Sequence, residues 1–271
     1  MVARNIPGRL FVHNLIVGRS LIYQLVRRDF EQRYVGSIAG WLWGIIHPLT
    51  LLAVYTFVFQ YAFGIKLDPA AVTDIYPLYL FCGMLPWMLF SETLQRSATS
   101  LVDNANLLKK SVFPSETIPL SIFLSGLASH ALALVLAIGA TAIWAGTWSP
   151  MLWILPLYLV LLALFSVGLA WIIAALQVYL RDAAQVLTVV LTAWFWLTPI
   201  FIEESRMATL LPGVMAWNPL TYFVRSYRDT ILGGQLPALA DVGAMAGFGV
   251  ASCVVGGLFF RHAKRGFADV L

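Results

Sequence analysis

Residues 117–180 read TIPLSIFLSGLASHALALVLAIGATAIWAGTWSPMLWILPLYLVLLALFSVGLAWIIAALQVYL, a run of 64 residues without one Asp, Glu, Lys or Arg. His130 is its only basic side chain. Because roughly 20 apolar residues cross a bilayer core as a helix, this run is long enough to cross twice. Residues 146–150, GTWSP, supply the turn between the two crossings. The run therefore predicts an all-α integral membrane protein.

The whole chain has the composition of that class. Of its 271 residues 60% are hydrophobic and 11% are charged, and its mean hydropathy is +0.83. We expect one membrane domain over 1–271 with room for about six spans. The net charge of +4 does not imply a nucleic-acid partner, because Lys and Arg flank membrane helices in any case. Cys82 and Cys253 lie in apolar stretches, which predicts neither a disulfide nor a metal site.

Charge-free stretches predict the six spans, and the basic residues predict their orientation. Six spans place both termini on one side of the membrane, together with 13 of the 17 Lys and Arg residues. By the positive-inside rule the termini are cytoplasmic. The spans are expected near 38–63, 76–95, 118–145, 151–178, 184–202 and 242–260.

Residues 9–34, before the first span, have an amphipathic pattern. Apolar side chains including Leu15, Ile22 and Leu25 share one helical face, and polar ones including Gln24 share the other. Such a helix is expected to lie in the cytoplasmic interface. Asp29 falls on the apolar face, so either the helix ends there or Asp29 meets a basic partner.

Two connections are too long to be simple turns. The cytoplasmic segment 97–117 is expected to hold a short helix from 101 to 113, stopped by Pro114. The external segment 204–241 contains two apolar pieces, Met207–Trp217 and Leu220–Leu232, and each is too short to cross. We expect two re-entrant half-helices that turn at Asn218-Pro219, or alternatively an amphipathic pair on the surface.

Motifs for chemistry are missing from this sequence. It has no P-loop, since none of its four lysines follows a glycine, and it has no HExxH or nucleophile elbow. Carboxylates inside the spans, which would mark an ion-coupled transporter, are also rare. The chain is therefore expected not to be an enzyme, to bind no cofactor or metal, and to take its energy from another protein.

Several short motifs follow one another along the chain: Arg28-Asp29-Phe30, RYVGS at 33–37, GWLW at 40–43, His47-Pro48, GMLPW at 83–87, YLRD at 179–182, FWLTPI at 195–200, WNPL at 217–220 and RDTILGG at 228–234. In this order they resemble the motifs of the ABC-2 type permeases that export bacterial surface polysaccharides. The resemblance covers nearly the whole chain and is greatest to O-antigen exporters, with capsule and teichoic-acid exporters next.

The resemblance implies a particular assembly. The permease pairs as a homodimer, and two copies of a separate ATPase carry the ATP and Mg²⁺. The substrate is a polysaccharide on a polyprenyl-diphosphate or phospholipid anchor, and the location is the bacterial inner membrane.

Two cytoplasmic segments are candidates for the contact with the ATPase. A rigid element that the ATPase can push is expected in segment 97–117, and a second at the turn before the fifth span. The same basic residues can instead serve as positive-inside anchors or helix caps. The candidates are Leu107, Leu108, Lys109, Lys110, Phe113, Arg181 and Asp182, with Arg28 and Asp29 near the ATPase or the lipid diphosphate.

A channel for sugar polymers should be aromatic and mostly uncharged, so that rings stack on sugars without holding them. Aromatic side chains also anchor helices at both bilayer interfaces. The channel candidates are Trp41, Trp43, His47, Tyr55, Phe59, Trp194, Trp196 and Phe201.

An external gate is expected where Pro199 kinks the fifth span and Asn218-Pro219 breaks the re-entrant segment. Arg225 and Arg228 share a helical face, so they either line the exit or lie among the outer headgroups.

Two other functions remain open at this point. One is an ABC-2 permease for a small molecule or lipid. The other is a membrane enzyme acting on polyprenyl-linked sugars, which would need clustered Asp, Glu or His at one membrane face.

Overall fold

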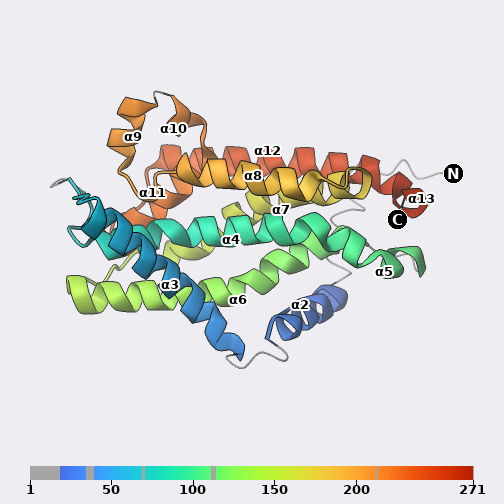
Figure 1. Cartoon of the computed structure of the whole chain (residues 1–271), viewed down its shortest axis with the longest axis horizontal. Helices are drawn as coiled ribbons and strands as arrows, with labels where there is room; N and C mark the ends of the chain where they lie inside the picture. The colour runs from blue at the N-terminus through green and yellow to red at the C-terminus, as the bar shows by residue number, and fades with distance from the viewer. Residues whose placement is uncertain (1–18, 35–39, 69–70, 111–113, 212, 271) are drawn as a thin grey trace.

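The computed structural model describes residues 19–34, 40–68, 71–110, 114–211 and 213–270, and over these ranges it contains helices and no strand. Helices α4, α6, α7, α8 and α12 run along the long axis, and α3 crosses them at a slant (Figure 1). The helices are α2 Arg19–Tyr34, α3 Trp43–Thr56, α4 Tyr76–Asp103, α5 Ala105–Lys110, α6 Thr117–Ala140, α7 Leu155–Tyr179, α8 Ala183–Trp196, α9 Glu204–Leu210, α10 Val214–Trp217, α11 Pro219–Ile231, α12 Leu239–Ala263 and α13 Phe267–Val270.

Four continuous helical segments in the described residues are long and apolar enough to cross a membrane. They are Trp43–Ala62, Thr117–Ala145, Leu152–Tyr179 and Leu239–Gly266, with 20 to 29 residues each. Helical turns at their ends, such as the π-helical turn Phe57–Ala62 after α3, extend the α-helices. The prediction of an all-helical membrane protein is confirmed at this level.

Helix α4 is the centre of the bundle. It contacts α3, α6, α7, α8 and α11, and 19 of its 28 residues are buried. Helix α8 lies at the edge, with only three of its 14 residues buried. Its remaining face is apolar and exposed, which leaves a surface for lipid or another protein chain.

Helices α7 and α12 pack backbone against backbone through glycines. A Cβ atom added at Gly256 would lie 2.0 Å from the carbonyl oxygen of Gly168, and one added at Gly168 would lie 2.4 Å from the backbone of Ser252. The Ser252 hydroxyl also donates to the carbonyl of Phe165 at 2.8 Å. Small residues and polar contacts of this kind drive helix association in lipid, so α7 and α12 form one rigid pair.

Three details of the predicted helices are wrong. Helix α8 ends at Trp196, so Pro199 lies in a buried turn and does not kink a continuing helix. Helix α4 continues to Asp103 before the short α5 begins, so a separate helix does not start at residue 101. The apolar piece 207–217 is not one half-helix but α9 and α10, and Gly213 between them has the left-handed φ of 82°.

Helix α2 packs its apolar face on α6. Leu25 is buried there, while Gln24 and Arg27 on the opposite side are exposed. Asp29 does not end the helix, which continues to Tyr34. Its carboxylate instead pairs with Arg96 of α4 at 2.5 Å, so the alternative with a basic partner holds. The predicted residues 9–18 lie outside the described part of the chain.

Candidate functional site

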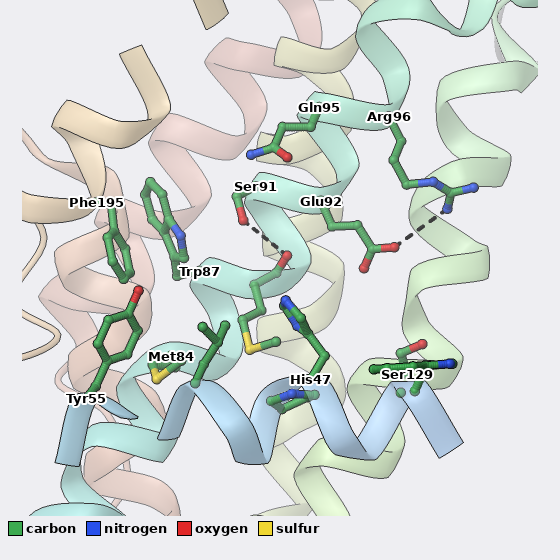
Figure 2. Close-up of a pocket in the computed structure, with 15 residues that line it drawn as sticks. His47, Tyr55, Met84, Trp87, Ser91, Glu92, Gln95, Arg96, Ser129 and Phe195 are labelled. Carbon is green, nitrogen blue, oxygen red and sulfur yellow. Dashed lines mark hydrogen bonds and ion pairs between the residues drawn. The ribbon is translucent and has the colours of Figure 1, made fainter. Parts of the chain in front are cut away.

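A groove of about 520 Å³ lies between α3 and α4 (Figure 2). We call it the α3–α4 groove. Helix α3 supplies one wall and α4 the other, and single residues of α6 and α8 contribute at the edges. Its lining includes Trp43, His47 and Tyr55 of α3, Met84, Trp87, Met88, Ser91, Glu92, Gln95 and Arg96 of α4, Ser129 of α6 and Phe195 of α8.

One end of the groove rests on an aromatic cluster centred on Phe201, in the turn after α8. The Phe201 ring is buried, and its centroid lies 4.9 Å from that of Tyr55 and 4.6 Å from that of Phe59. The centroids of Phe195 and Trp196 are each 5.1 Å from it. These separations are typical of stabilising ring pairs. The cluster joins α3 to α8 and presents Trp196 on the exposed face of α8.

The other end of the groove is polar. Arg96 lies between two carboxylates, 2.5 Å from Asp29 of α2 and 3.6 Å from Glu92 of α4. With both carboxylates ionised the three side chains carry a formal charge of −1, so the trio attracts an anion poorly. Its effect is to fasten α2 to the mouth of the groove. Arg28 is exposed and donates to the neutral Asn104 side chain at 2.8 Å, which keeps its charge available.

Residues 197–203, which follow α8, are not helical, and we call them the break after α8. Arg228 of α11 donates hydrogen bonds to backbone carbonyls in this break. The side chain is 5% exposed. It donates to the carbonyls of Pro199 and Ile200 at 2.7 Å each and to that of Tyr79 at 3.1 Å. The guanidinium also lies 3.5 Å from the centroid of the Tyr79 ring. A Cβ atom at Gly83 would lie 2.4 Å from the guanidinium, so a larger residue there would have to displace the guanidinium from its hydrogen bonds.

Asn218 joins the same break to the start of α11. Its carbonyl oxygen accepts from the Trp194 indole at 2.8 Å and caps α11 by accepting from the Leu220 amide at 3.1 Å. Its amide nitrogen donates to the carbonyl of Leu197 at 3.1 Å and to the hydroxyl of Thr198 at 3.2 Å. The end of α8 and the beginning of α11 are thus held as one unit.

Arg225, three residues before Arg228, has a different environment. It is partly exposed and pairs with Glu204 of α9 and, at 2.7 Å, with Asp241 of α12. The neighbouring Glu203 accepts from the backbone amide of Asp68, in the α3–α4 connection. The predicted common placement of the two arginines, at the exit or among the headgroups, is therefore wrong for Arg228, which lies inside the bundle.

The other predicted site residues lie in several different parts of the structure. Trp43, His47 and Tyr55 line the α3–α4 groove, and Phe59, Trp196 and Phe201 belong to the aromatic cluster. Trp194 packs behind it, against Phe90 and Asn218. Arg181 and Asp182 are exposed in the turn before α8, Leu108 is partly buried in α5, and Pro219 is buried at the start of α11. The side chains of Trp41, Leu107, Lys109, Lys110 and Phe113 lie outside what the structure describes.

The α4 wall of the groove was not predicted. Trp87, Ser91 and Gln95 recur every four residues, and so do Met84, Met88 and Glu92, which is the spacing of one helical face. This face changes along α4 from the apolar Met84, Trp87 and Met88 to the polar Ser91, Glu92 and Gln95, and that pattern was available in the sequence. For metal binding, no group of three or more His, Cys, Asp or Glu residues converges within the described ranges.

Helical segments long and apolar enough to cross a membrane define the class of integral membrane proteins. Comparison with known proteins specifies it further: the sequence profile of the ABC-2 type transporter family matches residues 20–232, and this chain belongs to that family. With its apolar helices, it is a multi-pass membrane protein.

Individual relatives cover nearly the full length. The O-antigen export system permease protein RfbA of Myxococcus xanthus is 28% identical over 95% of this chain and 98% of its own. The protein of the same name from Klebsiella pneumoniae is 27% identical over 93% and 95%. The polysialic acid transport protein KpsM of Escherichia coli is 23% identical over 92% and 95%. The relatives are named as export permeases and transport proteins, not as enzymes.

Proposed function

We propose that this chain is the membrane subunit of an ATP-driven exporter that moves a lipid-linked polysaccharide, of the O-antigen or capsule type, across the bacterial inner membrane. The relatives named for O-antigen export and polysialic acid transport support the substrate class. The observation on this chain that carries the proposal is the α3–α4 groove, because its aromatic end and the polar side chains of α4 suit a sugar polymer.

The groove matches the chemistry of sugars in two ways. Aromatic rings such as Tyr55 and Phe195 offer apolar faces on which the apolar faces of sugar rings stack. Ser91 and Gln95 along the opposite wall offer hydrogen bonds to hydroxyls. Its charged trio at the polar end is internally paired, so a polymer passing through meets neither a strong cation nor a strong anion.

Six spans follow if α4 and α8 cross the membrane in addition to the four apolar segments. Helix α4 has 28 residues, a length of about 42 Å, which exceeds a hydrocarbon core of about 30 Å. Helix α8 has 14 residues and is only about 21 Å long. Its crossing is completed by the non-helical residues 197–203, whose carbonyls Arg228 and Asn218 satisfy, as backbone at membrane depth requires. Both termini then lie on the same side, and the positive-inside rule makes that side cytoplasmic.

Two copies of the chain close the groove into a channel. One side of the groove is open, and both the helical segment Trp43–Ala62 and α8 keep exposed apolar side chains beside it, including Phe57 and Trp196. A second permease covers these faces. Two copies of a separate ATPase, carrying ATP and Mg²⁺, contact α5 and the turn at Arg181-Asp182, and α2 presents Arg28 toward the ATPase or the lipid diphosphate.

Segment 204–241 forms the external gate. Helix α11 dips into the membrane as a re-entrant helix and is fixed there by Arg228, while α9 and α10 cover the exit. The ion pairs of Arg225 hold α9 against α11 and α12 in the structure described.

Deletion of the gene in its native host tests the proposal. Fractionation of lipid-linked glycans should show one surface polysaccharide lost and its lipid-linked polymer accumulated inside. Complementation with wild type or with Trp153→Ala, at a position 69% exposed and away from the groove, should restore export. Complementation with Tyr55→Ala should not. Unchanged surface glycans would favour a small-molecule exporter, and loss of polymer without accumulation would favour a role in synthesis.

A further inference from the structure

An ion pair between a buried carboxylate and a partly exposed ammonium joins the end of the cytoplasmic segment 97–117 to the C-terminal segment. The Glu116 side chain is 4% exposed and accepts from the Lys264 ammonium at 2.6 Å. The backbone carbonyl of Glu116 also accepts from the Trp171 indole of α7 at 3.0 Å. Glu116 lies directly before α6. It therefore contacts both α7, through Trp171, and the end of α12, through Lys264.

The Glu116 side of this contact is a rigid turn. The Thr117 hydroxyl and amide both donate to the carbonyl of Pro114, at 2.7 and 2.9 Å, and the Ile118 amide donates to that of Ser115. Residues 115–117 are all buried. A displacement of Pro114 therefore reaches α6 through a hydrogen-bonded turn and not through a loose loop.

The Lys264 side is equally well held. The Tyr179 hydroxyl donates to the carbonyl of Ala263 at 2.6 Å. Phe267 is buried against the rings of Tyr179 and Phe260. A Cβ atom at Gly266 would lie 2.6 Å from the Tyr179 hydroxyl oxygen, so the chain passes close to α7 here. Lys264 is thus not on a free tail but on a segment folded back over α7.

Burying a carboxylate is costly, and such a pair is weak evidence of a net gain in stability. The presence of this pair is better explained by a mechanical role, since it makes the start of α6 and the end of α12 move together. Because α7 and α12 already pack backbone to backbone, the Glu116–Lys264 contact adds α6 to a single moving body.

We propose that Glu116 and Lys264 are positioning residues that transmit motion of segment 97–117, driven by the ATPase, to α6, α7 and α12 as one unit. This inference rests on the proposed function, since it takes segment 97–117 as the part that the ATPase pushes. It concerns transmission and not docking, because the Glu116 carboxylate is buried at the point where α6 begins.

The test uses the permease purified with its ATPase and reconstituted in vesicles loaded with the lipid-linked polymer of the native host. The variants are Glu116→Gln, Lys264→Met and the charge exchange Glu116→Lys with Lys264→Glu. The matched control is Arg261→Met, an exposed cation on the same helix. We expect both single variants to retain the ATPase and to hydrolyse ATP, while polymer exported per ATP falls about tenfold, within the range that coupling residues produce. The exchange should recover a large part of that loss.

A second readout does not depend on the polymer. Cys253 of α12 is partly exposed, and in a Cys82→Ser background its labelling rate by a membrane-permeant maleimide should change when nucleotide is trapped on the ATPase. In Glu116→Gln this nucleotide-induced change should disappear. If wild type shows the labelling change but moves no polymer, the proposed substrate fails while the transmission proposal stands.

Three results would overturn the inference. They are single variants that keep the wild-type export ratio and labelling change, single variants that lose the ATPase from the complex, and an exchange variant no better than either single variant.

Discussion

Arg228 offers the sharpest test of how the break after α8 is held. In Arg228→Met the carbonyls of Pro199 and Ile200 lose their donors in a buried site. Each unsatisfied acceptor costs about 1–3 kcal/mol, so the free energy of unfolding should fall by about 2–6 kcal/mol. The carbonyl of Tyr79 lies inside α4 and keeps its helical donor, so it adds little.

Two measurements test this prediction: maleimide labelling of Cys82 near Arg228, and denaturant unfolding of the whole protein. Cys82 is fully buried next to Gly83, whose position abuts the Arg228 guanidinium. In a Cys253→Ser background, Cys82 should resist maleimide in wild type and react in Arg228→Met. Denaturant unfolding in detergent micelles gives the free energy. Arg228→Lys should recover only part of the loss, because an ammonium lacks the planar fork that reaches two carbonyls.

The control is Arg206→Met, which removes an exposed cation of α9 and should change the free energy of unfolding by less than about 0.5 kcal/mol. The reasoning is refuted if Arg228→Met unfolds at the wild-type denaturant concentration and leaves Cys82 unreactive, because the break would then be held by other contacts.

Three further substitutions each test a different part of the bundle. Phe201→Ala empties the centre of the aromatic cluster and should lower the free energy of unfolding by about 3–5 kcal/mol, measured by denaturant titration. Gly168→Val forces side-chain atoms into the backbone of Ser252 and should lower the melting temperature sharply, whereas Gly247→Val, with no atom within 4 Å of its Cβ, should not. Asn218→Ala removes the cap of α11, at a cost of about 1–2 kcal/mol, and also the bonds to the Trp194 indole and the Leu197 carbonyl, so the total loss in the same titration should exceed about 2 kcal/mol.

Much of the helical layout was predictable because the bilayer imposes it. Residues 117–180 became α6 and α7 with a turn between them, since a charge-free run has no other stable form in this setting. Asn218-Pro219 marked the start of α11, because proline at the first helical position and asparagine before it are local signals.

Contacts between distant segments were not predictable in the same way. The partner of Asp29 is 67 residues away and that of Glu116 is 148 residues away, and no periodicity relates them. Arg228 looked like a surface cation because charge normally means exposure, and only the carbonyls of the break after α8 make its burial favourable. Helix α8 ends before Pro199 instead of continuing through a kink, because Asn218 and Arg228 supply the hydrogen bonds that a continuing helix would otherwise give to the carbonyls of the break.

The most direct test of the account is whether the polymer passes along the α3–α4 groove during export. A photoreactive phenylalanine placed at Tyr55, in the groove, and one placed at the exposed Trp153 can be irradiated in cells that are exporting polysaccharide. The account predicts permease carrying covalently attached polymer at position 55 and none at 153. Active export with no adduct at 55, or with equal adducts at both positions, would contradict it.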